Sequence, residues 1–260
     1  MENFTGRNEL GAACSIYHHG EKVVDLCGGI RNKDTGEPWE EDTMVFVAST
    51  TKVLSAMAIA LAHSRGLLNY EELVCTYWPE FAQNGKEKVT VRQLLAHQAG
   101  LLALDAHVDR NVVADLDRLA VALAAQKPVW EPGMHQGYHA ITLGFYEGEL
   151  LRRVDPRHRS LGQFFQDEIA SPLGLDFYIR LPEEIPNSRL AKIQRVNPVT
   201  MILHPNPFTR AFLNPATLTF KAFWKNPGMA IAFGKDLMPV RNLEVPSQGG
   251  VGNARAIAHA

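Results

Sequence analysis

The sequence of 260 residues has few cysteines, no excess of charge of one sign and no long apolar run. Its three cysteines, Cys14, Cys27 and Cys75, are an odd number and form no C-x-x-C pair. We therefore expect free thiols in a reducing compartment. Cys14 and Cys27 fall on neighbouring predicted strands, and a disulfide between them is the alternative that the sequence leaves open.

Charge of one sign is also missing, since charged residues make up 21% of the chain and the formal net charge is −2. Proteins that bind nucleic acids or membrane surfaces carry a basic stripe, whereas the basic residues here are scattered. Their densest group, within 152–159, is typical of a solvated helix end. No apolar run is long enough to span a bilayer, and no signal peptide opens the chain. We expect a cytoplasmic protein without nucleic-acid or membrane partners.

The common metal and cofactor motifs are absent as well. The histidines show no ligand spacing and no H-E-x-x-H. His18 and His19 are adjacent and would point to opposite faces of a strand, and His97 is interpreted as a structural residue at a helix end. There is no P-loop and no G-x-G-x-x-G after a strand. The sequence therefore predicts neither a metal nor a cofactor.

What the chain does contain is a strand-rich start and a long helical block. Residues 11–29 predict a β-hairpin with Gly20 in its turn, and "MVFVA", 44–48, predicts a buried strand. The segment 50–63 predicts a helix that is apolar all round and hence buried. Further helices are expected at 89–101, 111–126, 139–152 and 160–170, with a loop at 131–138, loops and short helices over 181–240, and a Gly-rich loop leading into a helix capped by Asn253 within 246–260.

Ser49 and Lys52 stand at the junction between the predicted strand and the apolar helix. Positions i and i+3 share one face of a helix, so the two side chains occupy the same small volume. A serine hydroxyl becomes a nucleophile when a neighbouring base takes its proton, and burial lowers the pKa of a lysine so that it can act as that base. The structural alternative is a helix N-cap followed by an exposed lysine. The apolar strand before Ser49 and the apolar helix after Lys52 disfavour this alternative.

The segment "FVASTTKVLSAMAIALAHSRGLLNYEELVCTYWPEF" with "VTVRQLLAHQAGL" resembles the serine β-lactamase and penicillin-recognising superfamily, and it is most similar to the class C-like family VIII carboxylesterases. The likeness extends to "ELGAACSIYHHGEKVVDLCGG", to "WEPGMHQGYHAITLGFYEGELLRR" and to "VPSQGGVGNARAIAHA", so it covers essentially the whole chain. The S-x-x-K, "LLAHQAGL" and "PGxxxxY" motifs in this order are far more specific than any one of them.

The resemblance implies roles for three residues. Ser49 matches the nucleophile, Lys52 its helix partner and Tyr138 the tyrosine whose phenolic oxygen helps take the serine proton and delivers it to the leaving group. A buried tyrosine beside a lysine cation can run as a phenolate because the cation lowers its pKa. The alternative for Tyr138 is a loop aromatic that fills a gap. The backbone N–H of Ser49 is implied as one oxyanion donor.

Two departures from the family pattern bear on the activity. The lactamase members carry Tyr-x-Asn, whereas Ala140 stands at the third position here, which favours an esterase. The third motif, Lys- or His-x-Gly on a late strand, is absent, and "HQG", 135–137, is interpreted as a chance match. Relatives continue past the equivalent of Ala260, so we expect a chain truncated at its C-terminus, with the second oxyanion donor outside it and weak activity. Its start also resembles a point inside the family's first helix.

The resemblance implies an α/β plus α fold of the β-lactamase type, with an antiparallel sheet, flanking helices, a large helical insert and missing C-terminal strands. The expected domains are a discontinuous sheet domain, 1–50 with 241–260, and a mainly helical domain, 51–240. The predicted function is cleavage of short-chain carboxylic esters through a Ser49 acyl-enzyme, with weak lactam hydrolysis allowed. A non-catalytic binding or assembly module and a peptidase or transpeptidase are the alternatives, and homo-oligomerisation is left open.

Overall fold

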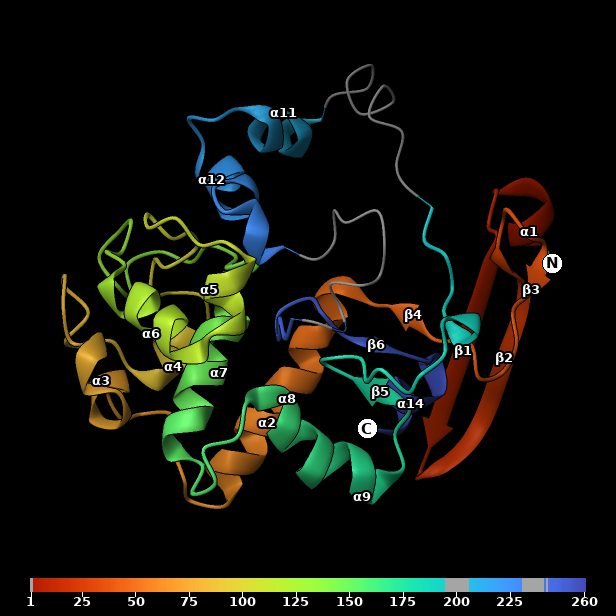
Figure 1. Cartoon of the computed structure of the whole chain (residues 1–260), viewed down its shortest axis with the longest axis horizontal. Coiled ribbons are helices and arrows are strands. Elements are labelled where there is room, and N and C mark those ends of the chain that lie inside the picture. The colour runs from red at the N-terminus through yellow and green to blue at the C-terminus, as the bar shows by residue number, and fades with distance from the viewer. Residues whose placement is uncertain (1, 195–205, 231–240, 242) are drawn as a thin grey trace.

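The computed structural model describes residues 2–194, 206–230, 241 and 243–260. Strands gather on one side of the molecule and most of the helices on the other, with helix α2 running between them (Figure 1). Among the described residues, the strands form two three-stranded antiparallel sheets, ordered β1-β2-β3 and β4-β6-β5. Their bounds are β1 Gly11–His18, β2 Glu21–Asn32, β3 Glu37–Pro38, β4 Val45–Phe46, β5 Phe177–Tyr178 and β6 Val251–Gly252.

The predicted hairpin is confirmed, and β2 runs three residues further than expected, to Asn32. His19 and Gly20 form its two-residue turn with φ values of 50° and 81°. Positive φ at both central residues is the mark of the type I′ turn, which suits the twist of paired strands. Cys14 pairs with Leu26 and not with Cys27, and all three cysteines are free, as predicted.

The second sheet brings together three distant parts of the chain, because β6 lies between β4 and β5. The predicted strand 44–48 is shorter than expected: β4 covers Val45–Phe46, and Met44 bridges to Leu190. The strand ends there because a 3₁₀ turn, η1 (Ala48–Thr50), begins at Ala48. The division into domains at 50 and 241 stays a prediction.

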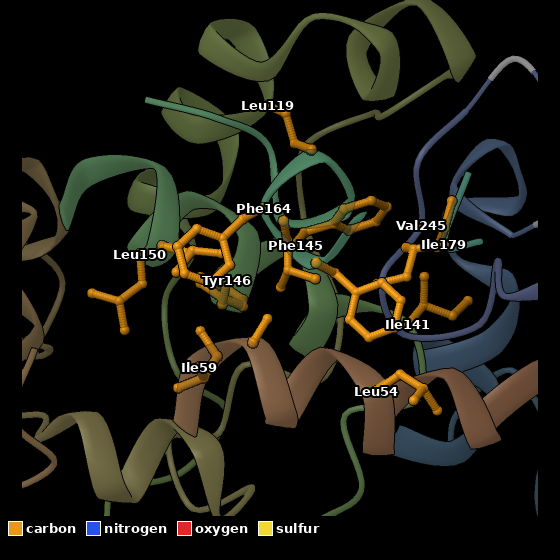
Figure 2. Packing of buried hydrophobic residues seen from close by; sticks show 14 of the residues in the cluster. Leu54, Ile59, Leu119, Ile141, Phe145, Tyr146, Leu150, Phe164, Ile179 and Val245 are labelled. Carbon is orange, nitrogen blue, oxygen red and sulfur yellow. The ribbon is translucent and has the colours of Figure 1, made fainter. Parts of the chain in front are cut away.

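Helix α2 (Thr51–Ser64) forms where the sequence predicted it and ends before Gly66, whose φ is 73°. Leu54 and Ile59 pack beneath aromatic residues of the neighbouring helices (Figure 2). The helix is not buried all round, however, since 59% of Val53 is exposed. The helix meets the sheets on one side and other helices on another, which leaves a third face open to solvent.

The helical block departs from prediction at two places. The expected helix 111–126 is two helices, α5 (Arg110–Ala114) and α6 (Leu116–Ala125), because Asp115 between them is extended and caps α6. The expected helix 89–101 is only α4 (Val91–Leu95), which opens with a capping box and ends before His97, where φ is 61°.

The predicted helices 139–152 and 160–170 are confirmed as α7 (Thr142–Val154) and as α8 (Leu161–Phe165) with its π-helical continuation η3 (Gln166–Ala170). Within 181–240 the described residues form short helices, and 195–205 and 231–240 lie outside the described residues. No helix among the described residues is long and apolar enough to cross a membrane. The remaining elements are α1 Glu2–Gly6, α3 Val74–Tyr77, η2 Pro79–Phe81, α9 Ser171–Leu173, η4 Asn187–Arg189, α11 Pro207–Leu213, α12 Leu218–Trp224, η5 Pro227–Met229 and α14 Ala254–His259.

Candidate active site

Ser49 lies in the tight turn that joins β4 to α2, with its side chain exposed. The preceding residue, Ala48, has a φ of 46°, a conformation that a non-glycine residue adopts only when its surroundings hold it. Thr51 supplies that hold: its Oγ1 donates to the Ala48 carbonyl at 2.5 Å and accepts from the Gly250 N–H at 2.8 Å. The turn is thus fastened to the loop before β6.

Lys52 lies one helical turn further on, with Nζ 3.5 Å from Ser49 Oγ. Nζ donates to the backbone carbonyls of Ala140 at 2.7 Å and of Ser247 at 2.8 Å. An ammonium has three N–H groups and a neutral amine has two and a lone pair. The two carbonyls occupy two N–H groups in either state, so the remaining N–H or the lone pair is left for Ser49 and Tyr138.

Burial lowers the pKa of Lys52, because desolvation penalises the ammonium. A hydrogen bond with Tyr138, the charge of Tyr138 and the charge of Glu147 oppose that effect and raise the pKa in part. The lysine is therefore held in place while its proton is made easier to remove. This is the electrostatic setting that a general base requires.

Tyr138 meets the same amine from the loop before α7, with its ring centroid 4.8 Å from Lys52 Nζ. The residue is 49% exposed, so the expectation of a buried tyrosine was wrong. The loop around it is pinned to the segment after α4: Gly137 N–H donates to the His97 carbonyl at 3.1 Å, and His139 N–H donates to His97 Nδ1 at 3.0 Å. The backbone, and not burial, positions the phenol.

His139 completes this support from inside the protein. Its Nε2 accepts from the Leu101 N–H at 2.8 Å, which leaves Nδ1 as the donor to the Gly137 carbonyl at 2.6 Å. Burial lowers the pKa of His139 to about 4, so the ring is neutral. Burial and the charge of Lys52 also lower the pKa of His97. Both histidines therefore act as neutral scaffolding, consistent with a structural His97.

The "HQG" segment has a packing explanation. A Cβ on Gly137 would lie 2.5 Å from the Trp130 ring, so no larger residue fits there. Gln136 donates to the Ala96 carbonyl at 3.1 Å, and His135 meets Trp130 edge on. The three residues build the loop that carries Tyr138. This structural role agrees with the interpretation of "HQG" as a chance match to the third motif.

Three parts of the site escaped sequence reasoning. The carbonyls of Ala140 and Ser247 have no sequence signal, because every residue has a carbonyl and only the fold aims it. Glu147 on α7 did have one: it is a carboxyl on a helix whose neighbours are apolar. It is 2% exposed and interacts electrostatically with Lys52.

A cavity of about 550 Å³ runs from Lys52 along α2. Its walls come from α2, from α7 and from the segment around α4, and they are mostly apolar. Among the described residues, no group of three histidine, cysteine, aspartate or glutamate side chains could hold a metal ion. The cavity is lined by Lys52, Val53, Ala56, Met57, Ile59, Ala60, Tyr70, Leu95, His97, Leu143 and Glu147.

Comparison with known proteins assigns the sequence to one family. The sequence pattern of the Beta-lactamase family matches residues 2–259, and the chain belongs to that family. It is 32% identical over 262 residues to "Esterase/beta-lactamase LipL" of Mycobacterium tuberculosis (strain ATCC 25618 / H37Rv), a match that covers 98% of this chain and 58% of that protein.

Solved structures agree on the β-lactamase-like fold. A family VIII carboxylesterase superposes with a TM-score of 0.80 at 36% identity, covering 98% of this chain and 65% of the other. A penicillin-binding protein homologue from Caulobacter crescentus gives a TM-score of 0.80 at 35% identity, covering 99% and 65%. The chain thus spans less than two thirds of the length of these relatives.

Proposed function

We propose that this chain provides the nucleophile, the base and the tyrosine of a serine ester hydrolase. One observation carries the proposal: Ser49 Oγ lies 3.5 Å from the Nζ of a half-buried Lys52, and the ring of Tyr138 lies against the same Nζ. Relatives described as an esterase/β-lactamase and a family VIII carboxylesterase support it. Short-chain carboxylic esters are the proposed substrates.

In the acylation step, Ser49 Oγ attacks the carbonyl carbon of the ester while its proton moves to the pair formed by Lys52 and Tyr138. The Ser49 N–H and the positive end of α2 stabilise the oxyanion that forms. The bond from the carbonyl carbon to the alkoxy oxygen then breaks. The leaving oxygen takes the proton through Tyr138, and the acyl group remains on Ser49.

Deacylation repeats these steps with water. The same pair takes a proton from water as its oxygen attacks the acyl carbon, and Ser49 leaves with a returned proton as the carboxylic acid is released. The Ser49 N–H supplies one oxyanion donor. The source of the second donor outside residues 1–260 stays a prediction.

An ester preference follows from Ala140. Its side chain is buried and carries no polar atom, and its carbonyl is already occupied by Lys52. It therefore offers no side-chain amide to the amide substituent of a lactam. We expect a higher kcat/KM for p-nitrophenyl butyrate than for nitrocefin on the same preparation.

The test compares three proteins: the unmodified chain, Ser49→Ala, and Ser64→Ala as a matched control at the exposed end of the same helix. Ester hydrolysis that is lost in Ser49→Ala and retained in Ser64→Ala supports the proposal. Faster turnover of nitrocefin would contradict the ester preference. Activity that survives Ser49→Ala would contradict the nucleophile.

The non-catalytic module and the peptidase remain the alternatives, and they predict different results. A binding module would leave Ser49 unreactive toward esters, while a peptidase would cleave peptide amides at least as fast as esters. We also propose a cytoplasmic location, which the three free cysteines support.

A further inference from the structure

Glu147 is a buried carboxyl without a counterpart that would explain its burial. The residue is 2% exposed, and its Oε2 has no hydrogen-bond partner among the described residues. A buried acceptor left unpaired costs free energy, so such a group calls for a compensating role. Glu147 lines the cavity that also holds Lys52.

Lys52 is the charged group that influences the pKa of Glu147. The titratable groups around the cavity are Lys52 from α2, His97 from the segment after α4, and Tyr70 from the loop before α3, with His63 stacked on Tyr70 at 4.0 Å. His97 accepts a backbone hydrogen bond and is neutral scaffolding. The charge of Glu147 raises the pKa of Lys52, and the charge of Lys52 lowers the pKa of Glu147.

We propose that Glu147 is a positioning residue that controls how readily Lys52 gives up its proton. When Glu147 is neutral, the burial of Lys52 is uncompensated and its amine is easily freed to take the proton of Ser49. When Glu147 loses its proton to solvent, its negative charge holds the ammonium form. The carboxyl thus opposes the base at high pH and releases it at lower pH.

The electrostatics of Glu147 and Lys52 fit this proposal. Burial raises the pKa of Glu147 to about 8, and the positive charge of Lys52 works against that rise. Because coupling between two sites is reciprocal, each group must shift the titration of the other. The inference builds on Lys52 as the proposed base, but proton positions can be measured without turnover.

The first experiment follows the Lys52 side chain by NMR in protein labelled at lysine nitrogen, with its resonance assigned by its loss in Lys52→Arg. In Glu147→Gln, we expect the Lys52 titration midpoint to shift to lower pH than in the unmodified chain. Glu244→Gln is the matched control, because burial also raises the pKa of the half-buried Glu244, but its carboxylate accepts hydrogen bonds from Ser160 and Gly162 and has Arg180 as its charge partner. We expect no shift there.

The second experiment does not depend on the fold of Glu147→Gln. Infrared titration of Glu244→Gln should show a protonated carboxyl that persists well above the ordinary glutamate pKa of 4.5 and ionises near pH 8. Adding Lys52→Met should move that ionisation to higher pH, because the opposing cation is gone.

An unshifted Lys52 midpoint in Glu147→Gln, or a carboxyl that ionises in the ordinary range, would overturn the proposal. Failure of the esterase assignment is a separate result: Ser49 would then resist acylation while both titrations still shifted.

Discussion

Lys52 meets two opposing demands at the level of the single residue. Its neighbours solvate the ammonium through the Ala140 and Ser247 carbonyls, while burial favours the neutral amine. The position of Nζ is therefore fixed, but its proton is not. The same amine contacts Tyr138, so we propose that the two groups serve one proton path.

Lys52→Ala and Tyr138→Phe should each lower the rate of Ser49 acylation by roughly two to four powers of ten, the usual effect of a positioned proton-transfer group. The double variant should lose less than the product of the single losses. Stopped-flow acylation by an activated ester measures this, with Lys88→Ala and Tyr17→Phe as controls away from the site. If the losses in the double variant simply multiply, Lys52 and Tyr138 do not share one site.

The proximity of Ser49 and Lys52 could be predicted because it is local: a spacing of three residues at the start of one helix brings the two side chains together whatever the rest of the fold does. Tyr138 needed the resemblance, since it lies 86 positions after Lys52 in the chain and no local rule links the two. Its half-exposed state was not predictable, because the pinning by His97 and His139 depends on tertiary contacts.

At the scale of elements, the site depends on how α2 holds the loop 246–250. Ser55 is buried, and its Oγ donates to the Pro246 carbonyl at 2.6 Å. The next carbonyl, that of Ser247, binds Lys52, while Ser247 Oγ donates to the Ile141 carbonyl at 2.5 Å. One face of α2 thus holds the loop that supplies one of the two acceptors of its own lysine, the Ser247 carbonyl.

Ser55→Ala should destabilise the protein by about 1–3 kcal/mol, because it leaves the buried Pro246 carbonyl unsatisfied. Ser64→Ala is the matched control: its hydroxyl is exposed and bonds within the helix to Leu61 at 2.9 Å. Urea denaturation measures both. Equal stabilities for the two variants would show that the contact with Pro246 does not fasten the loop.

Elements with strong local signals were predictable, and those decided by a single cap were not. The hairpin turn at His19 and Gly20 follows from local turn chemistry. The break at Asp115 does not show in the apolar pattern of 111–126, which continues through it. The Asp115 carboxylate accepts from the N–H groups of Asp117 and Arg118, and a new helix, α6, begins there. β5 has only two residues and no periodicity to detect.

At the scale of the whole molecule, the β1–β2 hairpin exposes an apolar outer face. Cys14 and Ile16 lie opposite Leu26 and Val24, so these apolar side chains share one face. Ile16 is 48% and Leu26 is 66% exposed. α14 packs against β1, where His259 stacks on Tyr17 and Arg255 binds Asp25, residues out of phase with that face.

We expect the chain of residues 1–260 to self-associate through this face, since apolar surface beside an edge strand favours pairing with a second copy. Leu26→Lys should shift the protein toward monomer in light scattering coupled to size exclusion. Val121→Lys on α6, at a site 72% exposed, is the control and should leave the association unchanged. A monomer at every concentration would contradict this prediction.

Ser49 is proposed to form the covalent intermediate, and peptide mass mapping after reaction with a fluorophosphonate tests this proposal. In a version of the protein that carries the second oxyanion donor, we expect one adduct, on Ser49, that is slowed in Lys52→Ala and unaffected in Ser64→Ala. An adduct on another residue would contradict it, as would an unmodified Ser49 in a protein whose circular dichroism shows it folded.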